Sequence, residues 1–442
     1  MPTRDDLKRL AAEAIDRAGD RLIAFAQDIV EHPEPGFKEV RTARRVEEFL
    51  RSLGLAPKAG IALTGVKAVA QGGSPGPTVA VMGELDSLIV PQHPKADPHT
   101  GAAHACGHHA QLGMLLGVAV GLLAPGVLPA LAGRVAFMAV PAEEYIELEH
   151  RLHLRQQGKI EFLGGKPEFI RLGEMDDVDM AMLTHTTSNP EEGKLAMSGT
   201  NNGIVAKFIQ FHGRAAHAGG APHLGINALN AAMIALAAIH ANRETFRDED
   251  TVRIHPIITK GGAAVNAVPD DVRMETFVRG RTMEAVLDAD RKVDRCLRAG
   301  ALAVGGKVTI TTLPGYLPLH TDPHLAAVYR ANAVALVGEE NYRQLGHRTG
   351  STDMGDVSHL MPVIHPYAGG AVGLGHGADY LVQDYQNAVL TAAKAMAWTV
   401  IDLLADGAVK AKEVKALHRP KMSKGEYLQY MRSLFSHHTY EG

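Results

Sequence analysis

The chain has 442 residues, of which 46% are hydrophobic and 21% charged, and its formal net charge is −4 at neutral pH. The length predicts two domains, and the composition is that of a globular α/β protein. The slight acidic excess gives no reason to expect nucleic acid as a partner. The two cysteines, Cys106 and Cys296, form no disulfide framework, so we expect reduced thiols and a cytoplasmic protein.

Two segments of the first third bear on targeting and membrane insertion. Residues 1–30 predict an amphipathic helix and not a signal peptide, because they carry acids at Asp5 and Asp6 and lack an apolar core before a cleavage site. Residues 110–133 contain no charged side chain and are long enough to span a membrane. Pro125 and Pro129 interrupt this run, however. We therefore predict a buried helix over residues 110–123, followed by a loop, and no membrane partner.

Three apolar runs in the first half of the chain are typical of buried parallel strands that end in chemically active side chains. They cover residues 77–88, 133–144 and 177–185, and they carry Asp86, Glu143 with Glu144, and His185. Alternation of such strands with helices predicts a doubly wound, mostly parallel sheet, in which ligands bind beyond the carboxyl ends of the strands. These side chains are therefore expected to converge on one edge of the sheet.

The pattern of elements changes near residue 200. A strand with a Gly-rich turn, a helix, two strands, a helix and a strand follow in order, ending at residues 307–314. This β-α-β-β-α-β order predicts a ferredoxin-like α+β domain that folds alone and can be inserted into another domain. We therefore expect one domain in two parts, residues 1–199 and 316–442, and an inserted domain over residues 200–315. The Lys-rich tail from residue 408 is expected to be a surface extension without a clear role.

Cys106 and His108 lie two residues apart, just before the predicted helix, so an extended backbone points both side chains to one side. Thiolate, imidazole and carboxylate are the ligands of zinc-like metals, and the helix N-terminus is expected to help to keep Cys106 ionised. In the Glu143–Glu144 pair, one carboxylate can bind a metal while the other takes a proton from an activated water. A Cys-x-His or Glu-Glu pair alone is a weak signal for a metal site. Four side-chain groups of the kind that bind metals, placed at three strand ends, indicate a hydrolytic metal centre.

Motifs from one end of the chain to the other extend this interpretation: GELDSL, HACGHHAQLGMLLGVA, PAEE, LTH, GRAAHAGGAPHLGINALNA, GGAAVNAVPD and GSTDMGD…GLGHGADY. Together and in this order they resemble the M20 metallopeptidases, most closely the amidohydrolase branch. That branch contains aminoacylases, auxin-conjugate hydrolases and aminobenzoyl-glutamate hydrolases. The resemblance implies a catalytic α/β domain interrupted by a lid domain that commonly makes dimers.

The resemblance also implies a role for individual residues around one or two divalent ions per subunit, zinc or manganese. The implied ligands are Cys106, as a bridge between ions, with His108, Glu144, His185 and His376. Glu143 falls on the general base, and Asp86 is implied to orient a metal-bound imidazole.

Three further implied residues lie in the lid. His217 matches a histidine that reaches the partner subunit's site in a homodimer and stabilises the oxyanion, and Asn266 and Arg279 match substrate contacts. From the residues alone, His217 is as readily a turn histidine, and Arg279 a surface ion pair.

The chain departs from the branch at two places. After CGH, where relatives have Asp and, two residues on, His, this chain has His109 and Gln111. The change alters the surroundings of His108, which makes His109 a candidate neighbour of the site and puts a second ion in doubt. Residues 145–176 form a longer and more charged stretch than the branch has. We expect it to line or cover the pocket, with Arg151, Arg155 or Lys159 as candidate substrate contacts or as a solvated helical face.

The leading hypothesis is a metal-dependent hydrolase that cleaves a C–N bond of a small molecule, an amide of an N-acyl amino acid or related conjugate, with Glu143 as general base. The alternative is a hydrolytic deaminase of an activated aromatic amine on the same metal site, motivated by His109, Gln111 and the long stretch. A third hypothesis is a binding protein that kept the fold and lost its chemistry. The intact set of ligands and base argues against it.

Overall fold

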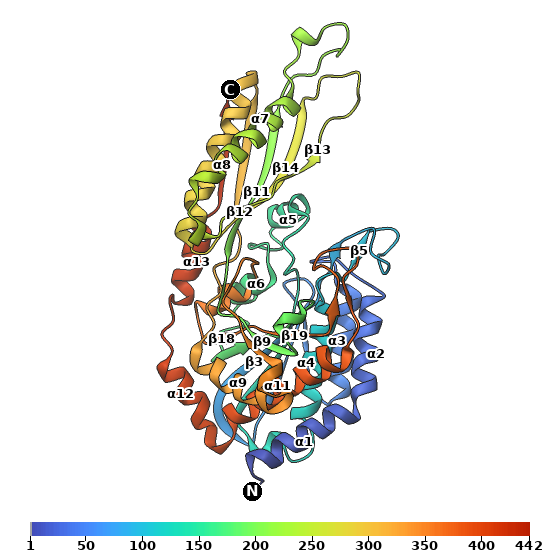
Figure 1. Cartoon of the computed structure of the whole chain (residues 1–442), viewed down its shortest axis with the longest axis vertical. Coiled ribbons are helices and arrows are strands. Elements are labelled where there is room, and N and C mark those ends of the chain that lie inside the picture. The colour runs from blue at the N-terminus through green and yellow to red at the C-terminus, as the bar shows by residue number, and fades with distance from the viewer. Residues whose placement is uncertain (1) are drawn as a thin grey trace.

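The computed structural model describes residues 2–442, which form an α/β domain and a second, elongated domain at opposite ends of the molecule (Figure 1). The central sheet of the α/β domain has the strand order β1-β2-β6-β3-β7-β18. Strands β3, β6, β7 and β18 are parallel, whereas β2 and β1 are added antiparallel at one edge. The bounds are β1 (Lys58–Ile61), β2 (Gly65–Gln71), β3 (Ser74–Glu84), β6 (Ala132–Val140), β7 (Met180–Met182) and β18 (Val363–Ile364). The mostly parallel sheet predicted from the apolar runs is confirmed.

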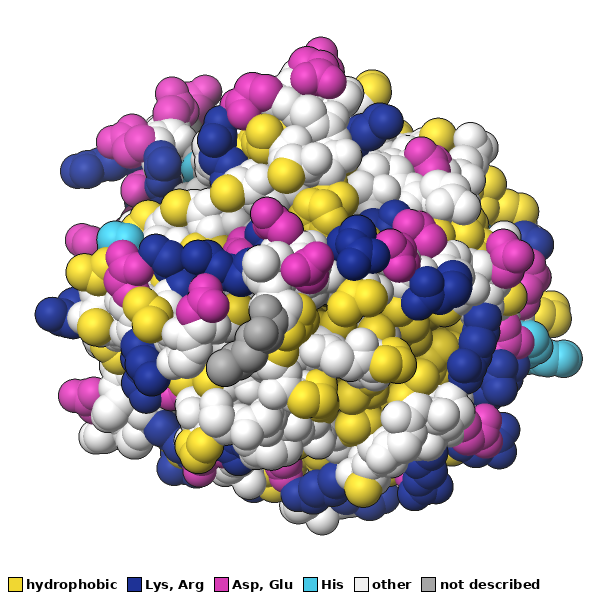
Figure 2. All heavy atoms as spheres, turned by 90° about the horizontal axis from the view of Figure 1, so that it is seen from below, with side chains coloured by type: hydrophobic (Ala, Val, Ile, Leu, Met, Phe, Trp, Pro, Cys, Tyr) yellow, Lys and Arg dark blue, Asp and Glu magenta, His cyan; other side chains and the backbone are white. Residues whose placement is uncertain are grey.

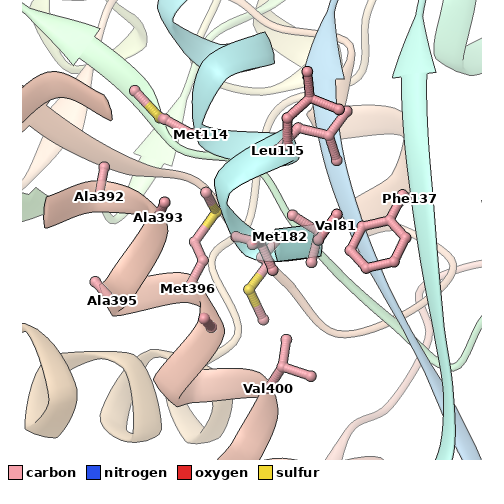
Figure 3. Packing of buried hydrophobic residues seen from close by; sticks show 14 of the residues in the cluster. Val81, Met114, Leu115, Phe137, Met182, Ala392, Ala393, Ala395, Met396 and Val400 are labelled. Carbon is pink, nitrogen blue, oxygen red and sulfur yellow. The ribbon is translucent and has the colours of Figure 1, made fainter. Parts of the chain in front are cut away.

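Helices cover both faces of this sheet. One face packs against α4 (His108–Leu122), which is itself covered by α11 (Ala392–Leu404). Met114 of α4, Met182 of β7 and Met396 of α11 belong to one buried apolar cluster (Figure 3). The same apolar cluster includes α1 (Arg4–Arg17), α2 (Gly19–Val30), α3 (Val40–Ser52) and α9 (Pro323–Val337). The other face carries α6 (Gly165–Leu172), α10 (Met354–Ser358) and α13 (Lys424–Ser433). Burial on both faces explains why the strands read as continuous apolar runs.

Two apolar helices bear on the membrane question. The predicted helix over residues 110–123 is present as α4, a 15-residue helix in which all residues but Val120 are buried. A second helix, Gln386–Leu404, has the length and composition to cross a membrane, but 78% of its apolar window is buried inside the fold. It begins with a π-helical turn, Gln386–Thr391. Both are core helices of the α/β domain.

The N-terminal segment differs from the single helix expected over residues 1–30. It forms two helices, α1 and α2, that meet at Ala18, where ψ is 3° and the helical geometry is interrupted. The break lets each helix turn its own apolar side chains into the core.

The second domain follows the predicted β-α-β-β-α-β order, except that the first of the two strands between the helices is divided into two short strands, β12 and β13. The sheet has a five-strand path β12-β14-β11-β15-β22, and β13 also pairs with β14. Helices α7 and α8 cover one face and bury it. The bounds are β11 (Gly203–His212), α7 (Ala228–Ala241), β12 (Arg253–Ile254), β13 (Ile257–Lys260), β14 (Asp271–Gly280), α8 (Met283–Val304), β15 (Lys307–Pro314) and β22 (Ser436–Glu441). The ferredoxin-like character of this domain is confirmed.

The C-terminal tail is more than the surface extension we expected. Helix α12 (Val409–Leu417) leads to α13, whose Tyr427 and Met431 are fully buried in the α/β domain. The chain then crosses to the second domain, where β22 pairs antiparallel with β15 from Ser436 to Glu441. This pairing satisfies the backbone groups of an edge that β15 would otherwise expose. The last strand thus lies in the sheet of the second domain, whereas we expected all of residues 316–442 to belong to the first.

A smaller sheet, β16-β9-β19-β8, lies beside the central one and carries one of the predicted site residues. The run over residues 177–185 does not form one strand: β7 ends at Met182, and His185 begins β8 in the smaller sheet. The bounds here are β8 (His185–Thr187), β9 (Leu195–Met197), β16 (Tyr342–Gln344) and β19 (Pro366–Gly369).

The remaining elements are short. They are the paired strands β4 (Leu88–Ile89) and β5 (Ala102–Ala103), β10 (Thr200–Asn201) and β17 (His347–Arg348), β20 (Ala371–Val372) and β21 (Leu381–Val382), and the helix α5 (Leu148–Gln156). The end of the molecule that carries the N-terminus shows acidic and basic side chains interspersed with apolar ones (Figure 2). This face has no patch of a single charge, in keeping with the small net charge.

Candidate metal centre

The candidate ligands come together at the carboxyl edge of the central sheet. Glu143 and Glu144 follow β6, Cys106 and His108 lie at the N-terminus of α4, and His185 begins β8. His376 arrives from the loop between β20 and β21, with φ at 65° and its side chain 56% exposed. Segments far apart in the sequence therefore deliver thiol, imidazole and carboxylate groups to one place.

The distances between these groups are those of donors that share an ion. Sγ of Cys106 lies 3.3 Å from Nε2 of His185, and Oε1 of Glu144 lies 3.5 Å from Nε2 of His376. Two donors bound to one zinc-type ion at its usual bond lengths lie about 3 to 3.6 Å apart. Two groups have all their ligand atoms within 4.8 Å of one another, Cys106–His108–His185 and Cys106–Glu144–His376. Cys106 is the member that the two groups share.

Hydrogen bonds turn the imidazoles toward the cluster. Nδ1 of His108 lies 2.9 Å from the Asp86 carbonyl oxygen and 3.2 Å from Asp86 Oδ1, and Nδ1 of His185 lies 2.7 Å from the Thr186 carbonyl oxygen. Because Nδ1–H donates to these oxygens, Nε2 of each ring is left available to coordinate a metal. Asp86 Oδ2 also accepts the N–H of Glu144 at 2.8 Å. Asp86 thus lies where the resemblance implies, aligning one ligand and the backbone of another.

The protein environment shifts the pKa values of two central groups. Burial and the Glu144 carboxylate raise the pKa of the Cys106 thiol well above its usual range. Burial therefore opposes the ionisation of Cys106 that we expected the helix N-terminus to favour. Burial, Glu84 and Glu144 likewise raise the pKa of Glu143. Bound divalent cations favour the anionic form of both groups, so this donor set fits a metal site.

A cavity of about 620 Å³ opens onto the cluster. Its wall includes Cys106, both glutamates, Arg279 and the aromatic rings of Phe277 and Tyr316. Arg279 donates to Ser351 Oγ at 3.2 Å and lies 5.1 Å from the centre of the Phe277 ring. The salt bridges among residues 2–442 do not include Arg279, so its guanidinium faces the cavity without a carboxylate partner. This arrangement suits a small anionic ligand.

Three predicted residues lie elsewhere in the single chain. His217 and Asn266 are exposed in loops of the second domain and do not line the cavity. Nδ1 of His217 accepts the N–H groups of Gly219 and Gly220, which fixes its ring at the loop. His109 is buried, its Nε2 lies 3.2 Å from Tyr385 Oη, and it does not line the cavity.

The long stretch after Glu144 contributes Tyr145 to the cavity wall, and its other candidate residues support the site from outside. Arg151 is 1% exposed and donates to the carbonyl oxygens of Ala142 at 3.0 Å, Leu163 at 2.5 Å and Glu144. We expected Arg151 to be a substrate contact or part of a solvated face, and it is neither. It stabilises the loop that carries the two glutamates. Arg155 lies over the Phe435 ring at 3.9 Å, and Lys159 is exposed.

Sequence reasoning missed a buried polar network behind the cluster. Glu84, Lys166 and Asp353 are at most 1% exposed, and Lys166 Nζ lies 2.6 Å from Glu84 and bonds Asp353. Gln111 donates to Glu84 Oε2 at 2.9 Å, and its own Oε1 accepts the Glu84 N–H at 3.1 Å. Glu84 could have been suspected as a second acid near the end of the 77–88 strand. Lys166 gave no signal, because it lies in a stretch whose charges indicate exposure.

Comparison with known proteins places the chain. Residues 200–303 match the family model described as the peptidase dimerisation domain of M20 enzymes. Over 422 residues the chain is 30% identical to a Xaa-Arg dipeptidase of Mus musculus, an alignment that covers 90% of this chain and 89% of that protein. The chain belongs to the M20 peptidase family. It is a metal-dependent hydrolase that acts on C–N bonds, and the resemblance found in the motifs is confirmed.

Other M20 relatives agree with this assignment. The chain is 29% identical over 290 residues to an N-acyl-L-amino acid amidohydrolase of Geobacillus stearothermophilus, covering 63% of this chain and 70% of that protein. Its fold matches the crystal structure of the Bacillus subtilis YXEP protein, described as a dinuclear metal-binding peptidase of the M20 family. The TM-score is 0.61 at 21% identity, over 87% of this chain and 98% of that one.

Proposed function

We propose that this M20 enzyme hydrolyses the amide bond of N-acyl amino acids or dipeptides at a two-ion centre. The observation that carries the proposal is the position of Cys106 in both three-ligand groups. Cys106, His108 and His185 would hold one ion, and Cys106, Glu144 and His376 would hold the other. Zinc or manganese suits these ligands, and the thiolate favours zinc.

Glu143 is the proposed general base. Its carboxylate lines the cavity beside both three-ligand groups, and its Oε2 lies 3.9 Å from His108 Nε2. Ions bound in the centre polarise the scissile carbonyl and acidify a water. Glu143 takes the proton of that water and delivers it to the departing nitrogen. Tyr316 donates to the Glu143 carbonyl oxygen, and Arg151 to that of Glu144, so the base is held on a fixed loop.

Arg279 is the proposed receptor for the substrate carboxylate. Its unpaired guanidinium and the neighbouring Phe277 ring lie in the cavity wall near the two glutamates. A planar guanidinium binds a carboxylate through two parallel hydrogen bonds, and amino acid conjugates carry such a group. The names of the relatives, N-acyl-L-amino acid amidohydrolase and Xaa-Arg dipeptidase, support the same substrate class.

Two of the three features that motivated deamination of an aromatic amine lie away from the cavity, and of the third, the long stretch 145–176, only Tyr145 lines it. His109 and Gln111 suggested deamination, but neither lines the cavity. His109 contacts Tyr385, and Gln111 holds Glu84. Amide hydrolysis is therefore the better supported reaction.

The second domain is proposed to form a homodimer of this cytoplasmic enzyme. It matches a peptidase dimerisation domain, and α7 exposes the apolar side chains of Met233 (58% exposed) and Ile234 (40%). His217 and Asn266 lie in exposed loops of the same domain and are proposed to enter the cavity of the partner subunit. There His217 would stabilise the oxyanion.

A metal and product analysis tests the reaction. Purified enzyme is assayed for metal content and against N-acyl amino acids, dipeptides and aromatic amines, with product identification. We expect a bound transition metal, cleavage of amides only, and a loss of about 10²- to 10⁴-fold in kcat for Glu143→Gln. Protein that binds no transition metal, or a fully active Glu143→Gln variant, would contradict the proposal.

Mixed dimers test whether His217 acts across subunits. Co-expressed His217→Ala and Glu143→Gln chains, each inactive alone, can rebuild one intact site per mixed dimer. Random pairing then restores about a quarter of the wild-type activity. Action of His217 within its own chain predicts no restoration.

A further inference from the structure

Glu84 lies against a metal ligand in a way that the assigned roles leave unexplained. It is the last residue of β3 and is 1% exposed. Its Oε2 lies 3.1 Å from Nε2 of His108, the nitrogen that faces the metal cluster. Neither the sequence motifs nor the relatives give Glu84 a role.

This contact does not have the geometry of a hydrogen bond. Nδ1 of His108 lies within hydrogen-bond distance of the Asp86 carbonyl oxygen and of Asp86 Oδ1. Among the hydrogen bonds of residues 2–442, His108 Nε2 has no partner although it is fully buried. When the ring is neutral and Nδ1 carries its proton, the Nε2 lone pair and a carboxylate oxygen at this distance repel each other unless a cation binds to both. Without metal, a second proton on the ring can take the place of that cation, because Glu84 raises the pKa of His108.

The separation is the one expected for two donors on the same ion. Nitrogen and oxygen ligands about 2.0 to 2.2 Å from a metal lie about 2.9 to 3.5 Å apart in octahedral or tetrahedral geometry. Glu84, His108 and Glu143 also form a third group whose ligand atoms all lie within 4.8 Å of one another. We propose that Glu84 is a sixth metal-binding side chain and a donor to the ion that His108 holds. This inference rests on the proposed metal centre.

The chain holds Glu84 ready for this role. Lys166 Nζ bonds Oε1 at 2.6 Å, and Gln111 Nε2 donates to Oε2 at 2.9 Å. Oε2 keeps a second lone pair for a cation. The Lys166 ammonium is fixed in turn by Asp353. Gln111, one of the two departures from the motif of the relatives, therefore acts as a positioning residue whose side chain aligns the extra carboxylate.

An added carboxylate changes which ion the site prefers. Hard oxygen donors and a higher coordination number favour manganese over zinc, whereas thiolate favours zinc. The ion held by Cys106, His108 and His185 would gain one such donor, and the ion held by Glu144 and His376 would not. We therefore expect two ions of unequal metal preference in one subunit.

Metal titration of Glu84→Gln tests the proposal without any substrate. Affinities for Mn²⁺ and Zn²⁺ are measured by competition with a chromophoric chelator, and Cys106-to-Co²⁺ charge-transfer absorption reports the centre directly. We expect one of two Mn²⁺ ions to bind about 10- to 100-fold more weakly and the other unchanged. Zn²⁺ binding should change less than Mn²⁺ binding.

Glu39→Gln is the matched control, because Glu39 is equally buried but contacts no candidate ligand side chain. Its metal affinities should equal those of the wild type. Glu84→Asp serves as a second variant if Glu84→Gln fails to fold. It keeps the charge and withdraws the carboxylate by one methylene, so it should also weaken the binding of one ion. Affinities within twofold of wild type in both Glu84 variants would overturn the proposal. A wild-type protein that binds no metal would instead overturn the proposed function.

Discussion

Replacing Glu39 by Gln should make the protein more stable, by an amount that grows with pH. Glu39 is fully buried at the N-terminus of α3, where Oε1 accepts the Ala142 N–H at 2.8 Å and Oε2 bonds the Thr64 hydroxyl at 2.7 Å. A Gln side chain can make both bonds, with its amide donating to Thr64. The substitution therefore removes the titration and keeps the contacts.

The magnitude follows from the pKa of the buried carboxyl. Burial and the Asp86 carboxylate raise the pKa of Glu39 from 4.5 to about 8. The folded state thus holds a proton that the unfolded chain releases above pH 4.5, and wild-type stability falls as pH rises from 4.5 to 8. At pH 7 the cost is about 3 kcal/mol. For a chain of this length, with an unfolding entropy of about 2 cal/mol/K per residue, that is about 3 °C in Tm.

Thermal melts of both proteins between pH 5 and 8 check this reasoning. We expect Tm curves that nearly meet at pH 5 and separate by about 3 °C at pH 7, with Glu39→Gln the more stable. Glu39→Ala is the control: it loses the bond to Ala142, whose φ of 56° needs support, and should be less stable at every pH. A difference between wild type and Glu39→Gln that does not change with pH would refute the raised pKa.

Three further outcomes follow from the structure. Deletion of residues 436–442 removes the strand paired with β15, so amide hydrogen exchange should accelerate in β15. The contacts of Tyr427 in α13 should persist. Unchanged exchange in β15 would mean that β22 does not protect this edge. Arg279→Lys should raise KM about 10-fold or more for substrates with a free carboxylate and leave kcat within a few-fold, and an equal effect on carboxamide analogues would argue against a carboxylate receptor. Removal of the metal with a chelator should lower Tm by about 3 °C relative to protein with metal at 100 times its Kd, and readdition of the metal should restore Tm. A Tm that does not change with metal would be inconsistent with the proposed metal centre.

The convergence of the site could be predicted because it depends on local patterns. Apolar runs that end in Asp86 and in Glu143–Glu144 mark parallel strands, and parallel strands place their carboxyl ends at one edge. His185 shows the limit of this reasoning, since it belongs to a neighbouring sheet and still reaches Cys106. The electrostatics of Cys106 show a second limit, because burial raises the pKa of its thiol and opposes the effect of its own helix N-terminus.

Features that depend on distant partners could not be predicted from one sequence. Lys166 meets Glu84 across 82 positions and Asp353 across 187, and nothing around Lys166 marks it as buried. Strand β22 is polar and mostly exposed, so its sequence lacks the alternation that reveals a strand, and only its pairing with β15 defines it. The same holds for Arg151, whose contacts are backbone carbonyl oxygens that leave no trace in side-chain patterns.

Anomalous diffraction from crystals grown with Mn²⁺ or Zn²⁺ is the most direct test of the two-ion centre. We predict two peaks on either side of Cys106 Sγ, each about 2.0 to 2.4 Å from its ligand atoms. One peak should lie among His108, His185 and Glu84, and the other between Glu144 and His376. A single peak away from Cys106, or none at this edge of the sheet, would contradict the account.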